Sequence, residues 1–439
     1  MVPMRAVADS PLAACMSTTF EDLEQSADRG AAGADPFDAF LAGKSTVVGS
    51  PRHWFNMYFP AREFSEDLDI LVTSCVSAQA AQLAVTNPRG RIVAIDTDAD
   101  ALEQAEARKR KHALSNLEIV EQTVEDVSGL ERNFDLIFSS GELCYLTDPS
   151  RGLRALRDAL LPSGVMNLKL IGSYGRQGIQ LVRLMLGILG IHSGDPQERT
   201  REVLETLATA DPFGSGDSQL KSWAGDRSVI EALLQENEQT YDIPGLYRLV
   251  ESSGLRVQRP LCQAYYQPQC TQLAASGELF TQVMGLPEDN QQAITELYRG
   301  GMPAHEFIVC RDDRPASEYD ISFDGQGWLD YVPVANPGLS IIQEDLPPGT
   351  AARLRWDSHY YPEISALVDA RQASLFNAGD GFRTISEVIA EAGGGLQDGT
   401  DREFARNFFQ SMWRLDYLWF RTVSRRAALP EGPLPVAPI

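Results

Sequence analysis

Two polar residues follow two apolar runs, in a pattern typical of nucleoside-binding folds. Residues 70–72 form an apolar run that ends at Thr73, and residues 91–95 form another that ends at Asp96. In an open parallel sheet, ligands bind outside the carboxyl ends of the strands, where the strand order reverses. We therefore expect the Asp96 carboxylate to accept hydrogen bonds from both ribose hydroxyls of a nucleoside. The competing interpretation is a solvated aspartate at a strand end, or a helix N-cap.

Further strands and helices must hold these residues at one edge. The sequence predicts strands at 70–72, 91–95, 117–120, 134–138, 165–171, 255–258 and 305–311, and helices at 78–85, about 97–113, 150–160 and 243–253. Strands separated by helices of this length form a parallel sheet with helices on both faces. We predict one Rossmann-like α/β domain over residues 46–315, with the mostly helical residues 172–240 as a lid inserted above the sheet.

The two ends of the chain have a different character. Residues 1–45 show weak periodicity and are predicted to be an N-terminal arm. After a predicted linker at 314–317, residues 316–439 are expected to form a small α+β domain, for which a winged-helix topology is one option. Within it we expect strands at 327–332 and 351–356, and helices at 364–370, 385–392 and 403–418. Thr384 and Glu387 match a capping box at the start of one of these helices.

Composition limits the partners of this chain. Its 439 residues carry a formal net charge of -23, which disfavours binding to nucleic acid or anionic lipid. No apolar run approaches the roughly 20 residues that span a bilayer, and no secretion signal is recognisable, so we expect a cytoplasmic protein. The six cysteines form no C-x-x-C pair and the five histidines lack ligand spacing, so no metal site is predicted.

Five segments, in this order and spacing, resemble the class I S-adenosylmethionine-dependent methyltransferases. They are DILVTSCVSAQAAQLAV, GRIVAIDTDADALEQAEARKR, NLEIVEQTVEDV, FDLIFSSGELCYLTDP and LRALRDALLPSGVMNLKL, and the likeness extends over residues 67–311. The resemblance implies a seven-stranded sheet with helices on both faces, and S-adenosylmethionine as the cofactor. The cofactor-binding residues that it implies are Thr73, Ser74, Val76, Ala78, Gln79, Asp96, Thr97, Thr123, Val124 and Ser140.

The resemblance also assigns parts of the cofactor to parts of the chain. The loop after the first strand would cradle the methionine part, Asp96 the ribose and residues 123–124 the adenine, while residues 139–143 would line the methyl-transfer end. The loop, however, reads SCVSA at 74–78, where the family normally has Gly-x-Gly-x-Gly. Val76 resists a left-handed backbone, so either the loop follows another path or the pocket is narrowed. Thr123 stands where an acidic residue commonly meets the adenine amino group.

Side chains near the carboxyl ends of the strands are candidates for handling the methyl acceptor. A base is needed only if the acceptor is a hydroxyl or a protonated amine. Our first candidate is Tyr145, just past the fourth strand, and our second is Tyr174. The candidate substrate-binding residues are His53, Tyr58, Glu142 and Arg176. Tyr145 also suits a half-buried packing role, and Arg176 a salt bridge to a lid carboxylate.

Three functions remain compatible with these features. The first is a methyltransferase for a small molecule or a peptide, which works by in-line positioning of cofactor and acceptor. The second is a methyltransferase-fold protein that has lost its cofactor and serves as a scaffold or regulatory subunit. The third is an enzyme that uses the same pocket for another ligand or reaction. No G-x-G-x-x-G follows a predicted strand, which argues against a dinucleotide site. Residues 316–439 are expected to mediate a homodimer or contact a partner protein.

Overall fold

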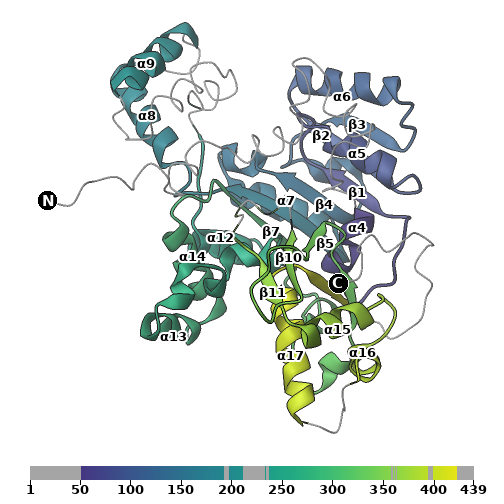
Figure 1. The fold of residues 1–439 in the computed structure, drawn as a ribbon. Helices are drawn as coiled ribbons and strands as arrows, with labels where there is room; N and C mark the ends of the chain where they lie inside the picture. Colours follow the sequence, from purple (N-terminus) through teal and green to yellow (C-terminus); the bar gives the residue numbers. More distant parts are fainter. Residues whose placement is uncertain are drawn as a thin grey trace, which may run out of the picture.

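The computed structural model describes residues 51–191, 197–210, 233, 237–356, 359, 361, 363–393 and 399–422. The predicted N-terminal arm at 1–45 lies outside the described residues. In the part that is described, a seven-stranded sheet occupies the centre of the molecule (Figure 1). Its strands are β1 Asp69–Val72, β2 Arg91–Asp96, β3 Leu117–Glu121, β4 Phe134–Ser140, β5 Leu160–Ile171, β6 Leu255–Pro260 and β7 Ala304–Arg311.

The strand order places the polar residues of β1 and β2 beside one another. The order is β3-β2-β1-β4-β5-β7-β6. The neighbours from β3 to β5 pair in parallel, and β7 runs antiparallel between β5 and β6. The chain leaves β1 toward β2 on one side and later returns to β4 on the other, so the order reverses at β1. This confirms the predicted seven-stranded sheet, with the carboxyl ends of β1, β2, β4 and β5 at one edge.

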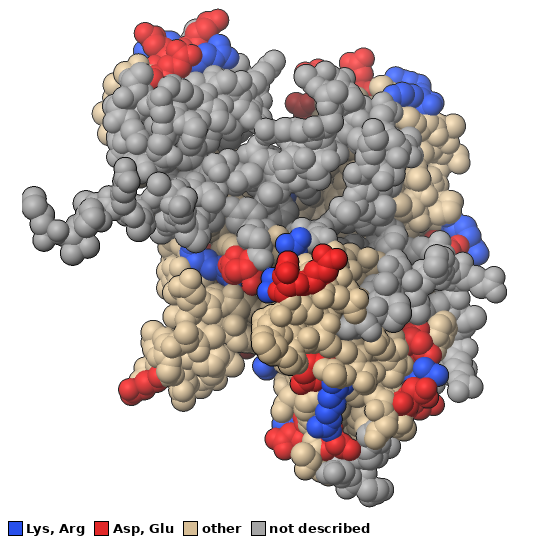
Figure 2. All heavy atoms as spheres, viewed as in Figure 1, with Lys and Arg blue, Asp and Glu red and all other residues tan. Residues whose placement is uncertain are grey.

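Helices cover both faces of the sheet, as predicted. Helices α4 Pro51–Tyr58, α5 Gln79–Thr86 and α6 Ala99–Lys111 pack on one face, and α7 Pro149–Ala159 and α12 Ile243–Ser252 on the other. Within β1, Ile70 and Val72 enter the first core and Leu71 the second. This alternation is the two-residue period of a strand buried on both sides. Helix α6 ends in four basic residues, which gather at the upper right of Figure 2 and suit the negative end of the helix dipole.

Two groups of helices leave the regular alternation. Helices α8 Gln177–Ile188 and α9 Gln197–Ala210 lie in the predicted lid and stand away from the sheet (Figure 1). Between β6 and β7 come α13 Glu278–Met284 and α14 Glu288–Arg299, together with three short 3-10 turns, η3 Gln263–Tyr266, η4 Pro268–Cys270 and η5 Gln272–Ala275. These helices lie in residues 259–304, where the sequence pattern predicts none.

The C-terminal part is α+β, as predicted, but several of its elements differ from the prediction. Its strands and helices are β8 Val332–Ala335, β9 Leu339–Ile342, β10 Ala352–Trp356, β11 Ala366–Val368, β12 Leu418–Arg421, α15 Ala370–Ala378, α16 Ile385–Glu391 and α17 Gly399–Arg414. The strand predicted at 327–332 is mostly the 3-10 turn η7 Gly327–Asp330. The helix predicted at 364–370 was wrong, because β11 pairs antiparallel with β10 there and the helix begins only after the Asp369 cap. The capping box of Thr384 and Glu387 is present.

The C-terminal part packs directly on the sheet. One continuous core runs from Ile70 and Phe138 of the sheet to Trp328 and Phe420. Within the predicted linker at 314–317, Arg314 is 4% exposed and donates from Nη1 to the Gln258 side chain at 3.3 Å. The domain boundary at 315 and the winged-helix option stay predictions.

Candidate functional site

The Asp96 carboxylate joins the ends of β1 and β2. Its Oδ2 accepts from the backbone N–H of Cys75 at 2.7 Å and from the Ser74 hydroxyl at 3.5 Å. Its Oδ1 accepts from the backbone N–H of Thr97 at 2.8 Å and of Asp98 at 3.0 Å. Asp98, not Asp96, caps helix α6. The Asp96 side chain therefore does not cap a helix. It anchors the loop that follows β1.

The loop between β1 and α5 needs no glycine in this protein. Among the described residues other than glycine, a positive φ occurs only at Ala113, Glu131, Asp345 and Asp416, none of which lies in this loop. Val76 therefore avoids the left-handed backbone that its branched side chain disfavours, and 66% of it is exposed. The loop therefore meets the restriction that Val76 imposes without a left-handed residue. Ala78 ends the loop with φ -80° and ψ 2°, and α5 begins at Gln79.

A buried carboxylate clamps the other side of the loop. Oε1 of Glu142 accepts from the Thr73 hydroxyl at 2.5 Å and from the Ser139 hydroxyl at 2.7 Å, and Oε2 accepts from the backbone N–H of Ser140 at 2.8 Å. Burial raises the pKa of Glu142, while the bonds from Thr73 and Ser139 act in the opposite direction. Glu142 was predicted to bind substrate; the structure places it where it ties the end of β1 to the end of β4.

The end of β4 also approaches the start of α5. The Ser140 hydroxyl donates to Oε1 of Gln79 at 3.3 Å, so these two predicted cofactor residues meet across the loop. Gly141 follows with φ +105°, and a side chain built there would meet nothing within 4 Å. The backbone of residue 141, within the stretch predicted to line the methyl-transfer end, therefore has open space beside it.

The predicted adenine residues lie next to Asp96. The backbone N–H of Gln122 donates to the carbonyl of Asp96 at 3.0 Å, which places residues 123–124 directly beyond the end of β2. The Thr123 hydroxyl donates to Oδ2 of Asp126 at 2.9 Å. The Asp126 carboxylate is thus held close to Thr123, the position at which the resemblance leads us to expect an acidic residue. Val124 is 7% exposed and belongs to the core on the α7 face.

A second cluster of side chains follows β5. Arg176 lies 3.7 Å from Oε2 of Glu238, and Arg183 of α8 lies 3.2 Å from the same oxygen. The lid carboxylate that was the alternative partner for Arg176 is therefore Glu238. Tyr241 continues this cluster, because its segment forms a bridge with Gly172. Sequence reasoning missed Arg183, Glu238 and Tyr241, and no motif at 238–241 could have signalled them.

The remaining predicted acceptor residues do not all gather there. Tyr145 closes the turn η2 Glu142–Tyr145 and is 37% exposed, and the carbonyl of its neighbour Cys144 accepts from the N–H of Gln239 at 2.7 Å. Tyr174 lies between β5 and α8, and burial, followed by the charge of Asp242, raises its pKa.

The two residues predicted from the aromatic segment lie elsewhere. His53 belongs to α4, but its side chain lies outside the described part. Tyr58 is 3% exposed, with its ring centroid 6.3 Å from that of Phe138, and burial raises its pKa. The structure therefore places Tyr58 in the core, away from an acceptor over the sheet edge.

The residues at this edge fit a nucleoside cofactor. A carboxylate offers about four acceptor positions. In Asp96 three are used by backbone N–H groups, and the fourth holds the Ser74 hydroxyl at 3.5 Å, the longest of the four bonds. A ribose hydroxyl can take that position if Ser74 turns away. Asp96 would then hold the ribose, residues 123–124 the adenine and the loop 73–79 the methionine part. Among the described residues, no group of three or more histidine, cysteine or acidic side chains is arranged to hold a metal ion.

Comparisons with known proteins agree with this geometry. Residues 68–166 match a family model described as a methyltransferase domain. The chain is 26% identical over 334 residues to an uncharacterised protein of Synechococcus sp., covering 72% of this chain and 75% of that one. It is 27% identical over 134 residues to trans-aconitate 2-methyltransferase of Deinococcus radiodurans, covering 30% of this chain and 48% of that one.

A solved structure has a similar fold over most of the chain. It is PKMT2 from Rickettsia typhi, with a TM-score of 0.58 and 14% identity, covering 86% of this chain and 76% of that one. The same protein in complex with AdoHcy gives a TM-score of 0.56 and 16% identity, covering 84% of this chain and 75% of that one. At this identity the likeness concerns the fold.

In the described part of the chain, no helix is long and apolar enough to span a membrane. The family match and the strand order together identify residues 68–166 as part of a methyltransferase domain with a Rossmann-like sheet.

Proposed function

We propose that this protein transfers the methyl group of S-adenosylmethionine to a small molecule or a peptide that lies over the carboxyl ends of β4 and β5. One observation carries the proposal, namely the Asp96 carboxylate placed across the ends of β1 and β2 with one position held only by Ser74. That position suits a ribose hydroxyl, since charged hydrogen bonds to a carboxylate are among the stronger ones in proteins.

The protein's part in this reaction is to position the reactants. When bound, S-adenosylmethionine supplies a methyl group already activated on a sulfonium, so little acid–base chemistry is required. Asp96 and Glu142 fix the loop 73–79 from both sides, which orients a cofactor held there. The open backbone at Gly141 leaves an acceptor room to approach along the line of transfer. Tyr145 lies four residues after Gly141 and is 37% exposed, and it is proposed as the base for a protonated acceptor.

Arg176 is proposed to orient an anionic acceptor. Glu238 is held mainly by Arg183, which lies 3.2 Å from Oε2 and donates from Nη1 to Oε1 at 3.3 Å. Arg176 lies farther away, at 3.7 Å, so Glu238 holds it less closely and an anionic acceptor could compete for its guanidinium. The relative named trans-aconitate 2-methyltransferase takes its name from an anionic small molecule, which makes carboxylate-bearing acceptors the first to test.

The test is titration calorimetry with S-adenosylhomocysteine. We expect binding by the unaltered protein and a loss of about tenfold or more in Asp96→Asn, because a hydrogen bond to a charged group contributes roughly 1.5–3 kcal/mol. Asp100→Asn, an exposed acid in the first turn of α6, is the matched control and should bind normally. Equal binding by the two variants would place the ribose elsewhere and contradict the proposal.

A second candidate is a scaffold or regulatory subunit that binds no cofactor. It is favoured by one observation, that the chain itself already occupies all the acceptor positions of Asp96. The third possibility, another ligand in the same pocket, has no observation of its own. If the scaffold proposal holds, millimolar S-adenosylhomocysteine should give no heat. Replacing Ser74, Val76 and Ala78 with glycine further distinguishes the methyltransferase from the scaffold. Since no residue of the loop needs a left-handed backbone, an active enzyme should gain less than about threefold in affinity.

A further inference from the structure

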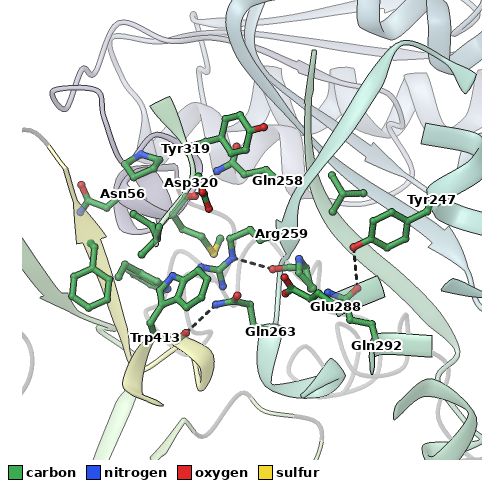
Figure 3. A pocket seen from close by; sticks show the side chains of 17 residues that line it. Asn56, Tyr247, Gln258, Arg259, Gln263, Glu288, Gln292, Tyr319, Asp320 and Trp413 are labelled. Carbon is green, nitrogen blue, oxygen red and sulfur yellow. Dashed lines mark hydrogen bonds between the residues drawn. The ribbon is translucent and has the colours of Figure 1, made fainter. Parts of the chain in front are cut away.

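A cavity separate from the cofactor site lies at the far edge of the sheet. Its volume is about 130 Å³, and it is lined by residues of β6, α4, α12, α14, α17 and β12 (Figure 3). Strand β6 is four steps from β1 in the strand order, which is roughly 19 Å at the usual strand spacing. A cavity of about 150 Å³ accommodates one benzene molecule, so this one has room for a ligand of side-chain size.

The floor of the cavity carries a balanced ion pair. Arg259 is 8% exposed and contacts Oδ1 of the fully buried Asp416 through Nη2. Nε of Arg259 donates to the carbonyl of Pro260 at 3.0 Å, and the backbone N–H of Ala264 donates to Oδ2 of Asp416 at 3.3 Å. The cation of Arg259 is therefore compensated within the protein. It offers no net charge to an anionic ligand.

Two buried amides each leave one polar atom for the cavity. Gln263 is 1% exposed, and its Nε2 donates to the carbonyl of Trp413 at 2.9 Å. Gln292 is 2% exposed, and its Oε1 accepts from the Tyr247 hydroxyl at 3.1 Å. The opposite amide atom of each side chain, Oε1 of Gln263 and Nε2 of Gln292, has no hydrogen-bond partner in the described part of the chain. The amide oxygen of Gln263 can accept a hydrogen bond and the amide nitrogen of Gln292 can donate one, so a ligand with polar groups suits this wall.

The charge that remains on the cavity wall is negative. Glu288 and Asp320 line the cavity, both are exposed, and neither forms an ion pair with another described residue. Glu288 stands one helical turn before Gln292 on α14, so their side chains share a face. Two arginines lie near Tyr319, but Arg314 pairs with Glu318 at 3.3 Å and Arg256 donates to the Tyr319 hydroxyl at 3.3 Å.

Aromatic rings complete the lining. Tyr319, Trp413, Trp419 and Phe420 contribute to the wall, and Figure 3 shows the Trp413 ring beside Arg259 and Gln263. Aromatic faces attract organic cations, and an aliphatic stem gains from apolar contact while its charged end reaches polar groups. A ligand with both features is an alkylammonium, as in a lysine side chain or a free aliphatic amine.

We propose that this cavity binds a primary alkylammonium group, with the ammonium held by the Glu288 carboxylate and by Oε1 of Gln263 and the alkyl stem against the aromatic wall. The formal net charge of -23 favours such a ligand, because it draws cations toward the protein as a whole. The proposal does not rest on the methyltransferase function, and it is tested without the cofactor.

The test uses calorimetry on the full chain with Nα-acetyl-lysine N-methylamide and cadaverine as cationic probes. Nα-acetyl-norleucine N-methylamide, which lacks the ammonium, is the neutral control. We expect saturable binding of a cationic probe and none of the neutral one. Stronger binding of the capped lysine identifies a peptide side chain as the source, and stronger binding of cadaverine a free amine.

Variants locate the binding. Glu288→Gln removes the proposed anion and should weaken binding about fivefold, the upper range for a partly exposed ion pair. Glu278→Gln removes the matching exposed acid in the first turn of α13, which does not line the cavity, and should change nothing. Equal binding of the neutral probe, equal effects of both variants, or no binding of either cationic probe would overturn the proposal.

Discussion

His359 should make the stability of the folded protein fall in mild acid. Its ring is 7% exposed and lies 4.8 Å from the Trp356 ring and 6.0 Å from the Tyr417 ring, measured between centroids. Neither ring nitrogen has a hydrogen-bond partner among the described residues. Burial, followed by the charge of Arg299, lowers the pKa of His359 from 6.5 to about 4. The folded chain therefore resists the proton that the unfolded chain accepts.

The sign and size of the effect follow from this difference. Above pH 6.5 the residue is neutral in both states, and its contribution to stability is fully present. Between pH 6.5 and 4 only the unfolded chain binds the proton, so the free energy of unfolding falls as the pH falls through this window. With a folded pKa of about 4, the loss between pH 7.5 and 4.5 is about 2.5 kcal/mol.

The assay compares the unaltered protein with His359→Phe, which keeps a ring but cannot titrate. Urea unfolding followed by far-UV circular dichroism at pH 4.5, 5.5, 6.5 and 7.5 gives the difference in free energy of unfolding. That difference should grow by about 2.5 kcal/mol in favour of the variant as the pH is lowered. Trp356→Phe alters the same ring cluster without removing a titrating group, so its effect should not vary with pH. A constant difference for His359→Phe would refute the reasoning.

Three further predictions concern the loop clamp, a close packing contact and a helix cap. Glu142→Ala removes a carboxylate that accepts from two hydroxyls and one N–H, so hydrogen-exchange protection of residues 73–79 should fall at least about tenfold, and Glu142→Gln should lose less. Gly175→Ala would place a Cβ 2.4 Å from the Met302 carbonyl and should cost about 1–3 kcal/mol of stability, whereas Gly187→Ala meets nothing within 4 Å and should not destabilise. Thr384→Ala removes the α16 cap and should cost about 1 kcal/mol in urea unfolding. Unchanged hydrogen-exchange protection in Glu142→Ala would contradict the first prediction, and equal stability effects of the two glycine variants the second. An unchanged urea midpoint in Thr384→Ala would contradict the third.

The sheet could be predicted from the sequence because its strands are buried on both faces. The runs at 70–72 and 136–138 are apolar without interruption, and turns of Gly, Pro and Asn separate them from amphipathic helices. The region 259–303 could not be read in this way. Its helix α14 is polar over much of its length, with Gln292, Thr295 and Glu296 among its buried residues. Glu296 is paired through Oε1 with the buried His305, a contact that only the folded chain reveals.

The candidate site was partly predictable for a related reason. The carboxyl ends of parallel strands meet at one edge, so Thr73 and Asp96 could be predicted to lie together, and the family resemblance added Ser140. The path of the loop was not predictable, because it depends on Glu142, which lies 69 residues from Thr73 in the chain. The C-terminal strand β11 was misread as helix for a similar reason, since its pairing with β10 overrides the local pattern.

A crystal structure of the protein with S-adenosylhomocysteine tests the central claim most directly. The claim is that Asp96 exchanges the Ser74 hydroxyl, now at 3.5 Å, for a ribose hydroxyl, while Cys75 keeps its bond to the same carboxylate. We expect one ribose hydroxyl within about 3 Å of Oδ2 of Asp96, in place of the Ser74 hydroxyl, and the adenine beside residues 123–124. A nucleoside bound away from Asp96, or no nucleoside at all at saturating concentration, would contradict the account.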